Sequence, residues 1–380
     1  MRCGYFDSHR CRSCELMGVP YAEQLADLDR HLRETLPTVP TEAWSAPAAG
    51  PESHFRNKAK LVVGGRRGAP TLGILDTAGR GVDLRDCGLY EPGLHAALPP
   101  LADFVARTGL TPYDVPQRSG ELKHLLVTHS PDDELMIRFV LRSTGQLAKL
   151  ERALPDLSEH LPQTRVVSVN LLPEHRAATE GAEEHLLTQQ AELPMRLPEL
   201  TLYLGPQAFF QTDTAVAAML YQQAQQWVSD LRPKLVWDLF CGVGGFGLHV
   251  AQVCQPQVLR GIEISAAAVA SAQRAAAALD QTGTRCIFEA ADAEQELGTD
   301  APELLIVNPP RRGIGALAGR IEQSGVEYLL YSSCNAGSLA RDLAAMPSLH
   351  PVAARAFAMF PQTRHHEVLV LLRRIDHPAG

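Results

Sequence analysis

The stretch WDLFCGVGGFG, residues 237–247, decides the fold of this chain. An apolar run ends at Phe240 and is followed by four glycines, after which helix-forming sequence begins. Glycines in such a loop let the backbone turn sharply and approach a ligand closely. Glu263 ends the next apolar run, 21 residues after Gly242, where an acid is placed to bind ribose hydroxyls. The pattern predicts a nucleoside-containing ligand at the tip of a parallel sheet.

Two ligands fit this glycine loop. Gly242, Gly244 and Gly247 reproduce the G-x-G-x-x-G spacing of dinucleotide sites, in which pyrophosphate lies on the helix N-terminus. Asp238 stands just before the loop, however, and its carboxylate would repel a diphosphate. The same carboxylate suits the cationic amino group of S-adenosylmethionine. We therefore favour S-adenosylmethionine over a dinucleotide.

The sequence around this motif divides into three parts. From residue 206 to 380, strand-like runs alternate with helix-like stretches, which predicts a doubly wound parallel sheet of the α/β class. Its last two runs, 352–361 and 366–374, predict an antiparallel hairpin that closes one edge of the sheet. Residues 51–205 alternate short strand-like runs with turns and predict an α+β middle domain on an antiparallel sheet. Residues 1–50 form a cysteine-rich segment that ends in a proline-rich linker.

Composition indicates a folded protein of ordinary polarity. The 380 residues are 45% apolar and 21% charged, which is enough apolar sequence for a large core. No run reaches the roughly 18 apolar residues of a membrane span, and the start lacks a signal-peptide pattern. We therefore expect a cytoplasmic protein without a membrane partner.

One stretch of the chain is strongly basic, although the net charge is −8. The stretch FRNKAKLVVGGRRG, residues 55–68, contains no acid and is called the basic patch below. Its basic residues are Arg56, Lys58, Lys60, Arg66 and Arg67. The patch is either a solvated hairpin face or a contact for RNA.

A second motif, LLIVNPPRRGIG at 304–315, ends an apolar run with Asn308 and two prolines. Prolines cannot continue a strand and hold the backbone extended, which projects Asn308 over the predicted ligand cleft. The position after the fourth strand faces the substrate in S-adenosylmethionine enzymes. Arg311 and Arg312 follow, and arginine suits a phosphate or a uracil carbonyl. A plain tight turn is the alternative interpretation.

A third motif, LLYSSCN at 329–335, places Cys334 at the tip of the fifth predicted strand. Free cysteine often lies in cores, but strand tips of open α/β sheets are where ligands bind. Carbon 5 of uracil attacks a methyl group only after a thiolate has added to carbon 6, which makes Cys334 a candidate nucleophile. We expect its thiol pKa to be lowered in part by the helix that begins near Asn335.

The same reaction needs a base, because the methylated carbon 5 must lose a proton before the thiolate leaves. Glu367, at the start of the last strand-like run, is placed to take this proton. His365, His366 and Glu367 could also suggest a metal triad, but adjacent strand residues point to opposite faces and cannot chelate one ion well. A simple strand-capping acid is the remaining alternative.

The seven cysteines other than Cys334 fall into two groups. Predicted core residues, lying in or beside apolar runs, are Cys241, Cys254 and Cys286. The second group has the spacing C-x7-C-x2-C and a distant fourth thiol, and consists of Cys3, Cys11, Cys14 and Cys87. Disulfides are rare in cytosolic proteins, so four such thiols predict either zinc or an iron–sulfur cluster. The spacing does not decide between them.

Together these motifs resemble the bacterial RNA uracil-C5 methyltransferases, and within them the short type that modifies a uridine in 23S ribosomal RNA. The resemblance covers essentially the whole chain and rests on CRSC, FRNKAK, PQAFFQT, WDLFCGVGGFGLH, NPPRRGIG, YSSCNA and HHEVL. It implies a class I methyltransferase domain, with Cys334 as nucleophile and Glu367 as base. It implies a [4Fe–4S] cluster on Cys3, Cys11, Cys14 and Cys87. Around S-adenosylmethionine it places Gln211, Phe240, Glu263 and Asn308, and the loop adds Gly242.

Two departures from the family bear on function. Many relatives open with a β-barrel RNA-binding domain, whereas this sequence starts at the cysteines, so we expect the middle domain to grip RNA through Arg56, Lys58 and Lys60. Many relatives also have Asp-Pro-Pro where this chain has Asn308-Pro-Pro, as in the short ribosomal type. We expect a monomer that acts on 23S rRNA. The alternatives are a transfer-RNA uridine methyltransferase and an inactive iron–sulfur RNA-binding protein.

Overall fold

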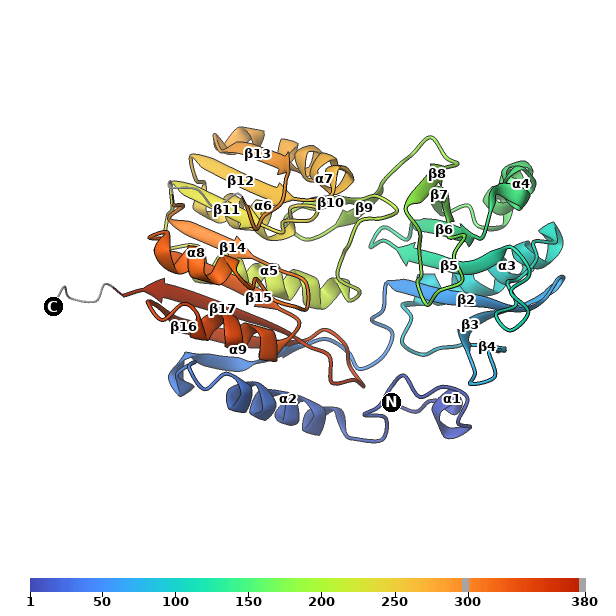
Figure 1. Ribbon diagram of the computed structural model, residues 1–380, viewed down its shortest axis with the longest axis horizontal. Helices are drawn as coiled ribbons and strands as arrows, with labels where there is room; N and C mark the ends of the chain where they lie inside the picture. The colour runs from blue at the N-terminus through green and yellow to red at the C-terminus, as the bar shows by residue number, and fades with distance from the viewer. Residues whose placement is uncertain (296–300, 376–380) are drawn as a thin grey trace. The chain divides into compact units, whose positions relative to one another are not determined.

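The computed structural model shows a chain folded into two compact units (Figure 1). The residues described are 1–295 and 301–375. Unit 1 contains residues 1–18 and 51–195, and unit 2 contains residues 19–50 and 196–380. The predicted segment 1–50 is therefore split, because its cysteine-rich start belongs to unit 1 and the rest to unit 2.

Unit 2 is built on an eight-stranded sheet in the order β1-β16-β17-β15-β14-β11-β12-β13. The strands are β1 (Trp44–Ala49), β11 (Leu235–Leu239), β12 (Val258–Glu263), β13 (Arg285–Ala290), β14 (Leu304–Val307), β15 (Tyr328–Ser333), β16 (Leu349–Ala358) and β17 (Glu367–Arg374). β11 to β15 pair in parallel, whereas β17 runs antiparallel to β15 and β16. The predicted doubly wound sheet is confirmed, and its carboxyl edge also receives the start of β17.

The predicted closure of the sheet by the terminal hairpin is wrong. β16 and β17 do form the hairpin, but β1 pairs in parallel with β16 and takes the edge position. The sequence of β1, WSAPAA, contains Pro47, which cannot donate a sheet hydrogen bond and is tolerated in edge strands. This proline and its neighbours made the stretch resemble a linker in the sequence.

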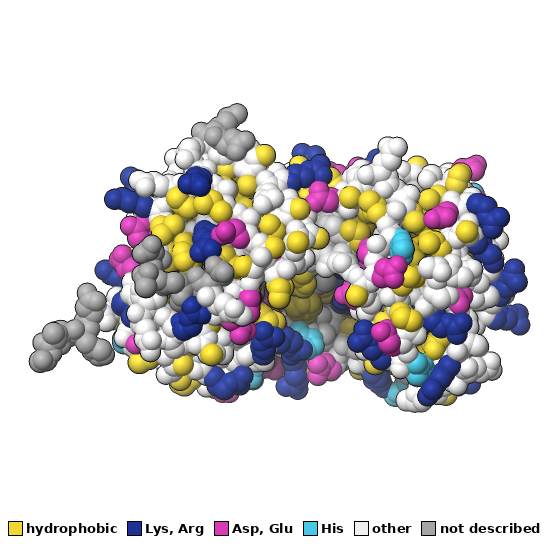
Figure 2. Space-filling view, turned by 45° about the horizontal axis from the view of Figure 1, so that its top comes forward, with side chains coloured by type: hydrophobic (Ala, Val, Ile, Leu, Met, Phe, Trp, Pro, Cys, Tyr) yellow, Lys and Arg dark blue, Asp and Glu magenta, His cyan; other side chains and the backbone are white. Residues whose placement is uncertain are grey.

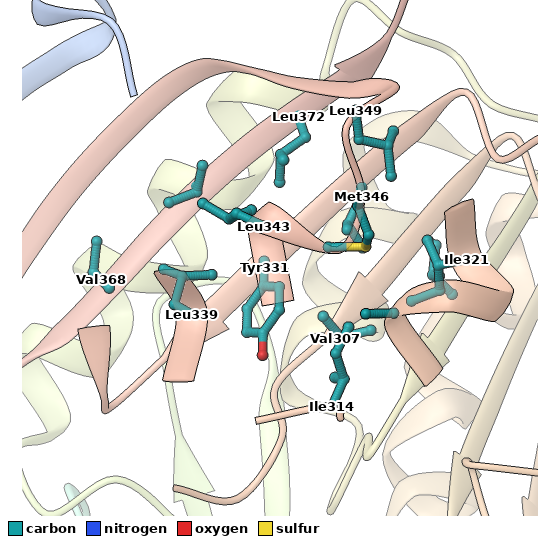
Figure 3. Packing of buried hydrophobic residues seen from close by; sticks show 14 of the residues in the cluster. Val307, Ile314, Ile321, Tyr331, Leu339, Leu343, Met346, Leu349, Val368 and Leu372 are labelled. Atoms are coloured by element: carbon teal, nitrogen blue, oxygen red, sulfur yellow. The ribbon is translucent and has the colours of Figure 1, made fainter. Parts of the chain in front are cut away.

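Helices cover both faces of this sheet (Figure 1). They are α2 (Tyr21–Thr35), α5 (Thr214–Val228), α6 (Gly245–Cys254), α7 (Ala266–Ala276), α8 (Leu317–Gln323) and α9 (Ala336–Ala344), with 3-10 turns η1 (Thr41–Ala43) and η3 (Ala277–Thr282). α2, α8 and α9 supply Leu32, Ile321 and Leu339 to one core. Figure 3 shows Tyr331 of β15 packed within this core, near Leu339 and Val307. The core holds the central strands in the positions from which their carboxyl ends present the site.

Unit 1 contains a seven-stranded sheet in the order β4-β3-β2-β5-β6-β7-β8. Its strands are β2 (Lys58–Arg66), β3 (Ala69–Leu75), β4 (Gly81–Asp83), β5 (Leu122–His129), β6 (Leu135–Leu141), β7 (Thr164–Leu171) and β8 (Glu183–Leu186). The helices are α1 (Gly4–Asp7), α3 (Pro92–Thr108), α4 (Leu147–His160) and the 3-10 turn η2 (Thr144–Gln146). The sheet is antiparallel as predicted, except that β6 and β7 pair in parallel across α4.

Two short strands, β9 (Leu193–Arg196) and β10 (Thr201–Leu204), form a separate two-stranded sheet. Across residues 1–295 and 301–375, we find no helix with the length and apolar character that crossing a membrane would need.

Candidate active site

The glycine loop leaves the carboxyl end of β11 in a strained conformation. Phe240 has a φ of 60°, which is uncommon for a residue with a side chain and marks candidate functional sites. Gly242 and Gly244 follow with φ values of 54° and 83°, and α6 begins at Gly245. Only glycine adopts such values without cost, so the loop places backbone rather than side chains at the sheet edge.

Glu263 lies beside this loop at the end of β12. Its Oε2 accepts a hydrogen bond of 3.1 Å from the Gly242 N–H, and its Oε1 accepts one of 3.0 Å from the Ser265 N–H. A carboxylate can accept about four hydrogen bonds, so two backbone donors orient Glu263 and leave capacity for ligand hydroxyls. The predicted pair of Gly242 and Glu263 is therefore brought together by the structure.

Asp238, the acid that precedes the glycine loop, is buried against the start of α6. It is 1% exposed, and its Oδ2 accepts a hydrogen bond of 2.8 Å from the Gly247 N–H in the first turn of α6. Burial raises the pKa of Asp238 to about 7. The side chain thus fixes α6 against β11.

The other two predicted donor-site residues lie at different places. Asn308 directly follows β14, the strand that pairs with β11 on one side and β15 on the other, and it is half-buried. Gln211 is buried in the loop between β10 and α5, close in sequence to Asp213, whose side chain caps α5. Asn308 therefore stands at the same edge as the glycine loop, whereas Gln211 comes from outside the sheet.

Cys334 and Glu367 lie at neighbouring strand ends. β15 and β17 are antiparallel, and Ser333 pairs with Val368, so the next position places Cys334 opposite Glu367. Cys334 is half-buried, whereas Glu367 is 2% exposed. The two side chains predicted as nucleophile and base are thereby brought together, although they are 33 residues apart in the sequence.

The thiol of Cys334 is not activated in the way the sequence predicted. Burial raises its pKa, the Glu367 carboxylate raises it further, and Arg311 opposes both effects. At the start of α9 the Asn335 side chain accepts hydrogen bonds from the Gly337 and Ser338 N–H groups. Arg311 is the nearby cation that favours the thiolate.

The loop that follows Asn308 is tied to the strand that carries Cys334. Asp342 of α9 is buried, and its Oδ2 accepts hydrogen bonds from the Tyr331 hydroxyl at 2.6 Å and from the Ile314 N–H at 2.9 Å. Gly313 has a φ of 85°, and a Cβ there would lie 2.3 Å from that same oxygen. Asp342 therefore sets the position of the NPPRRGIG loop relative to β15.

Three residues that support the site were not found from the sequence: Ser332, Tyr221 and Asp342. Ser332 Oγ donates a hydrogen bond of 2.5 Å to Glu367 Oε1. A Cβ at Gly245 would lie 2.5 Å from the Tyr221 hydroxyl, so this ring abuts the glycine loop. The only sign of these residues in the sequence was a polar side chain inside an apolar run. Which residue each of them contacts is decided by strand register or helix packing, which the sequence does not show.

The four cysteines predicted to bind a metal or cluster, Cys3, Cys11, Cys14 and Cys87, lie near one another in unit 1. Burial, followed by the neighbouring Cys87, Cys11 and Cys3 thiols, raises the pKa of Cys14 to about 12. Within the described ranges, however, no three His, Cys, Asp or Glu side chains are arranged to hold a metal ion, at these cysteines or around Glu367. The thiols converge without adopting a coordinating arrangement.

A half-buried cation, Arg56, accompanies these thiols. Arg56 lowers the pKa of both Cys14 and Cys87, and its backbone N–H bonds to the Leu89 carbonyl at 2.8 Å. In the described part of the chain its Nε is buried and has no hydrogen-bond partner. An unpaired guanidinium N–H beside four thiols fits a bound anionic group. The donor set therefore suits a thiolate-bound cluster in its chemistry.

Comparisons with known proteins show the family to which this chain is similar. Residues 151–375 match the family model described as tRNA (Uracil-5-)-methyltransferase. The chain is 46% identical over 376 residues to the Escherichia coli 23S rRNA (uracil(747)-C(5))-methyltransferase RlmC, covering 98% of this chain and 99% of that protein. It is 47% identical over 378 residues to RlmC of Yersinia pseudotuberculosis, with the same coverage.

A solved structure shows the same fold. It is the Pyrococcus abyssi tRNA (uracil-54, C5)-methyltransferase in complex with S-adenosyl-L-homocysteine. The TM-score is 0.76 at 21% identity, covering 94% of this chain and 85% of that one. At this identity the likeness concerns the fold.

Proposed function

Because the chain belongs to the tRNA (uracil-5-)-methyltransferase family, we propose that it transfers the methyl group of S-adenosylmethionine to carbon 5 of a uridine in 23S ribosomal RNA. The likeness to 23S rRNA methyltransferases over nearly the full chain supports this substrate, and the uridine corresponding to their position 747 is the expected target. The observation that carries the proposal is the placement of Cys334 opposite Glu367 at the sheet edge that holds the glycine loop.

The glycine loop and Glu263 are the proposed binding site for the methyl donor. The oriented carboxylate of Glu263 has lone pairs left for two ribose hydroxyls, and the loop backbone allows close approach. S-adenosylmethionine supplies an electrophilic methyl group when it is bound. Phe240, Asn308 and Gln211 complete this proposed site.

Cys334 makes the uracil ring reactive. Its thiolate forms a bond to carbon 6, and the displaced ring electrons make carbon 5 a nucleophile. Carbon 5 takes the methyl group while the bond from that methyl to the donor sulfur breaks, so that S-adenosylhomocysteine is the leaving group. Because burial and Glu367 raise the thiol pKa, thiolate formation depends on Arg311 and on the bound substrate. The uridine must leave its stack to reach the sulfur, which is cheapest in a single-stranded loop.

Glu367 completes the reaction by taking the proton from carbon 5. The electrons of that C–H bond re-form the ring double bond, and the bond between carbon 6 and the Cys334 sulfur breaks. Burial raises the pKa of Glu367 to about 7, near the value at which a general base works best in neutral solution. The carboxyl group therefore has a proton affinity suited to this step.

Trapping the intermediate tests both roles. Glu367→Gln should accumulate a covalent complex between protein and uridine RNA, seen as a slow band on a denaturing gel, because the thiolate cannot leave while carbon 5 keeps its proton. Cys334→Ala should form no complex and no product. Full methylation by Cys334→Ala, or an absence of the complex in Glu367→Gln, would contradict the proposal. An inactive RNA-binding protein would give neither product nor complex.

Transfer RNA is the second candidate substrate, because the family model carries that description. Methylation of a 23S rRNA fragment and of a transfer-RNA transcript, measured side by side with labelled donor, distinguishes the two. We expect the 23S fragment to be methylated. If the transfer RNA is methylated in preference, it is the substrate, and the proposed reaction at carbon 5 stays the same.

We further propose that Cys3, Cys11, Cys14 and Cys87 hold a [4Fe–4S] cluster. Support comes from the convergence of the four thiols and from the buried Nε of Arg56 beside them, which would offset part of the negative charge of the cluster. Metal analysis of anaerobically purified protein should find iron and sulfide, and Cys14→Ser should lose the visible absorption. Zinc without sulfide would favour the alternative metal.

For RNA binding by unit 1 we propose Lys58 and Lys60 rather than the whole basic patch. Both side chains lie on the face of β2 opposite the core residues Ala59 and Leu61. Lys60 is exposed, whereas Lys58 is half-buried and burial lowers its pKa to about 8. Arg56 faces the thiols instead. On the face shown in Figure 2, lysine and arginine side chains in dark blue lie among acidic ones in magenta. Together with the net charge of −8, this mixture favours RNA binding through a few specific lysine–phosphate contacts over binding through a continuous basic surface.

A further inference from the structure

The candidate base is held by a neighbour on the adjacent strand. Ser332 Oγ donates a hydrogen bond of 2.5 Å to Glu367 Oε1. Ser332 is fully buried and Glu367 is 2% exposed, so water does not compete for this bond. Among the described hydrogen bonds Glu367 uses only Oε1. The bond thus leaves Oε2 as the oxygen available to a substrate.

Few titratable side chains surround Glu367 in the described part of the chain. Cys334 directly follows β15, Tyr221 belongs to α5, and β16 places the apolar Phe357 opposite Glu367. Tyr221 and Cys334 are both influenced by the Glu367 carboxylate, and neither donates a hydrogen bond to it among the described residues. The Ser332 hydroxyl is therefore the group in this part of the structure that directly stabilises the carboxylate.

We propose that Ser332 is a positioning residue for the general base: its hydroxyl orients the Glu367 carboxyl group and keeps it ionised, so that Oε2 can take the proton from carbon 5 of uracil. This inference rests on the proposed function. It adds a residue that touches neither the ribose site nor the nucleophile, and it assigns the two adjacent serines of YSSC different tasks.

Two opposing effects on the pKa of Glu367 predict what happens when the Ser332 hydroxyl is removed. Burial raises the pKa of Glu367 to about 7, and the hydrogen bond from Ser332 lowers it. Removing the hydroxyl leaves burial unopposed, so the pKa rises and the carboxylate fraction at neutral pH falls. Proton abstraction should then need a higher pH, whereas the earlier attack by Cys334 should not.

Ser333 is a matched control. Successive residues of a strand point to opposite faces, and Ser333 Oγ donates to the Asn335 carbonyl at 3.1 Å and accepts from the Asn335 N–H. Ser333→Ala therefore removes an equally buried hydroxyl beside the same cysteine without touching Glu367. It should leave the pH dependence of proton release as in the wild type, whatever it does to the overall rate.

The test uses full-length protein and a 23S rRNA fragment carrying tritium at carbon 5 of uracil. Tritium released into water reports proton abstraction, and the protein–RNA complex on a denaturing gel after rapid quenching reports thiolate addition. In Ser332→Ala we expect the complex to form at no higher pH than in the wild type, and the tritium-release profile to shift upward by about one pH unit. Ser332→Cys, which keeps the volume but donates weakly, should shift the profile in the same direction.

The outcomes separate this inference from the proposed function. If Glu367→Gln traps the complex and stops tritium release, while both Ser332 variants share the wild-type pH profile, the positioning role is wrong and the reaction stands. If Glu367→Gln releases tritium normally, Glu367 is not the base and the proposed function fails first. A loss of rate in Ser332→Ala without a pH shift would mean that the serine only stabilises the fold.

Discussion

Replacing Gly245 by alanine should distort the glycine loop and weaken donor binding. The added Cβ would lie 2.5 Å from Oη and 2.8 Å from Cζ of Tyr221, so the two residues must separate by about 0.9 Å to reach ordinary contact. Tyr221 has little room to retreat, because its ring stacks on His249 at 4.6 Å and meets Phe246 edge-on at 5.1 Å. Overpacking of this kind costs about 1–3 kcal/mol of folding free energy.

Tryptophan fluorescence during urea unfolding measures this cost in unit 2 alone, because all three tryptophans belong to that unit: Trp44, Trp227 and Trp237. Gly319→Ala is the control, since a Cβ at that exposed position of α8 meets nothing within 4 Å. Its stability should stay unchanged or rise. The affinity of Gly245→Ala for S-adenosylhomocysteine, measured by calorimetry, should fall about tenfold for each 1.4 kcal/mol lost by the loop.

A double-mutant cycle decides whether the clash is the cause. Tyr221→Phe removes the oxygen nearest to the new Cβ, so the pair Gly245→Ala and Tyr221→Phe should be more stable than the two separate costs predict, by at least about 0.5 kcal/mol. Strictly additive costs, or a Gly245→Ala protein as stable as the wild type, would refute the reasoning.

Three other perturbations test the energetics of the site and the RNA contact. The stability of Glu367→Gln relative to the wild type should rise by about 2–3 kcal/mol between pH 5 and pH 8. The folded pKa of Glu367, about 7, lies above the unfolded one, so the wild type loses stability as the pH rises through that window. Urea unfolding at both pH values measures this difference, and parallel pH profiles of the two proteins would contradict it. Tyr331→Phe should cost about 1.5–3 kcal/mol in the same assay, since the hydroxyl bonds to the buried Asp342 carboxylate; an unchanged midpoint would show that this bond is not stabilising. Lys60→Glu should weaken RNA binding and flatten the slope of log affinity against log salt in filter binding; an unchanged slope would remove Lys60 from the RNA interface.

The parts of the site that the sequence predicted are those fixed by short-range pattern. An apolar run that ends in glycines predicts a strand, loop and helix by itself, and the acid at the end of the next run then falls beside Gly242. Cys334 could be placed at a strand tip for the same reason. These predictions depend on local sequence and on the fact that parallel strands end at one edge.

The parts that were missed depend on pairing between distant segments. The contact of Ser332 with Glu367 needs the register of β15 against β17, and nothing in YSSC says which serine faces the base. The thiol pKa of Cys334 was expected to fall, but burial and the Glu367 carboxylate at the start of β17 raise it. Because successive side chains point to opposite faces of a strand, the sequence leaves two possible orientations for the two serines and does not select between them.

The route of residues 19–50 limits how the enzyme can be divided. Since α2 and β1 complete a sheet whose other strands come after residue 196, a fragment cloned from that point onward would carry β16 as a bare edge and leave uncovered the apolar surface that Leu32 and Leu36 protect. Such a fragment should aggregate when produced alone. Transplanting the methyl-transfer unit into another protein therefore requires joining 19–50 to its downstream partner through a new linker, and a simple truncation is not a usable starting point.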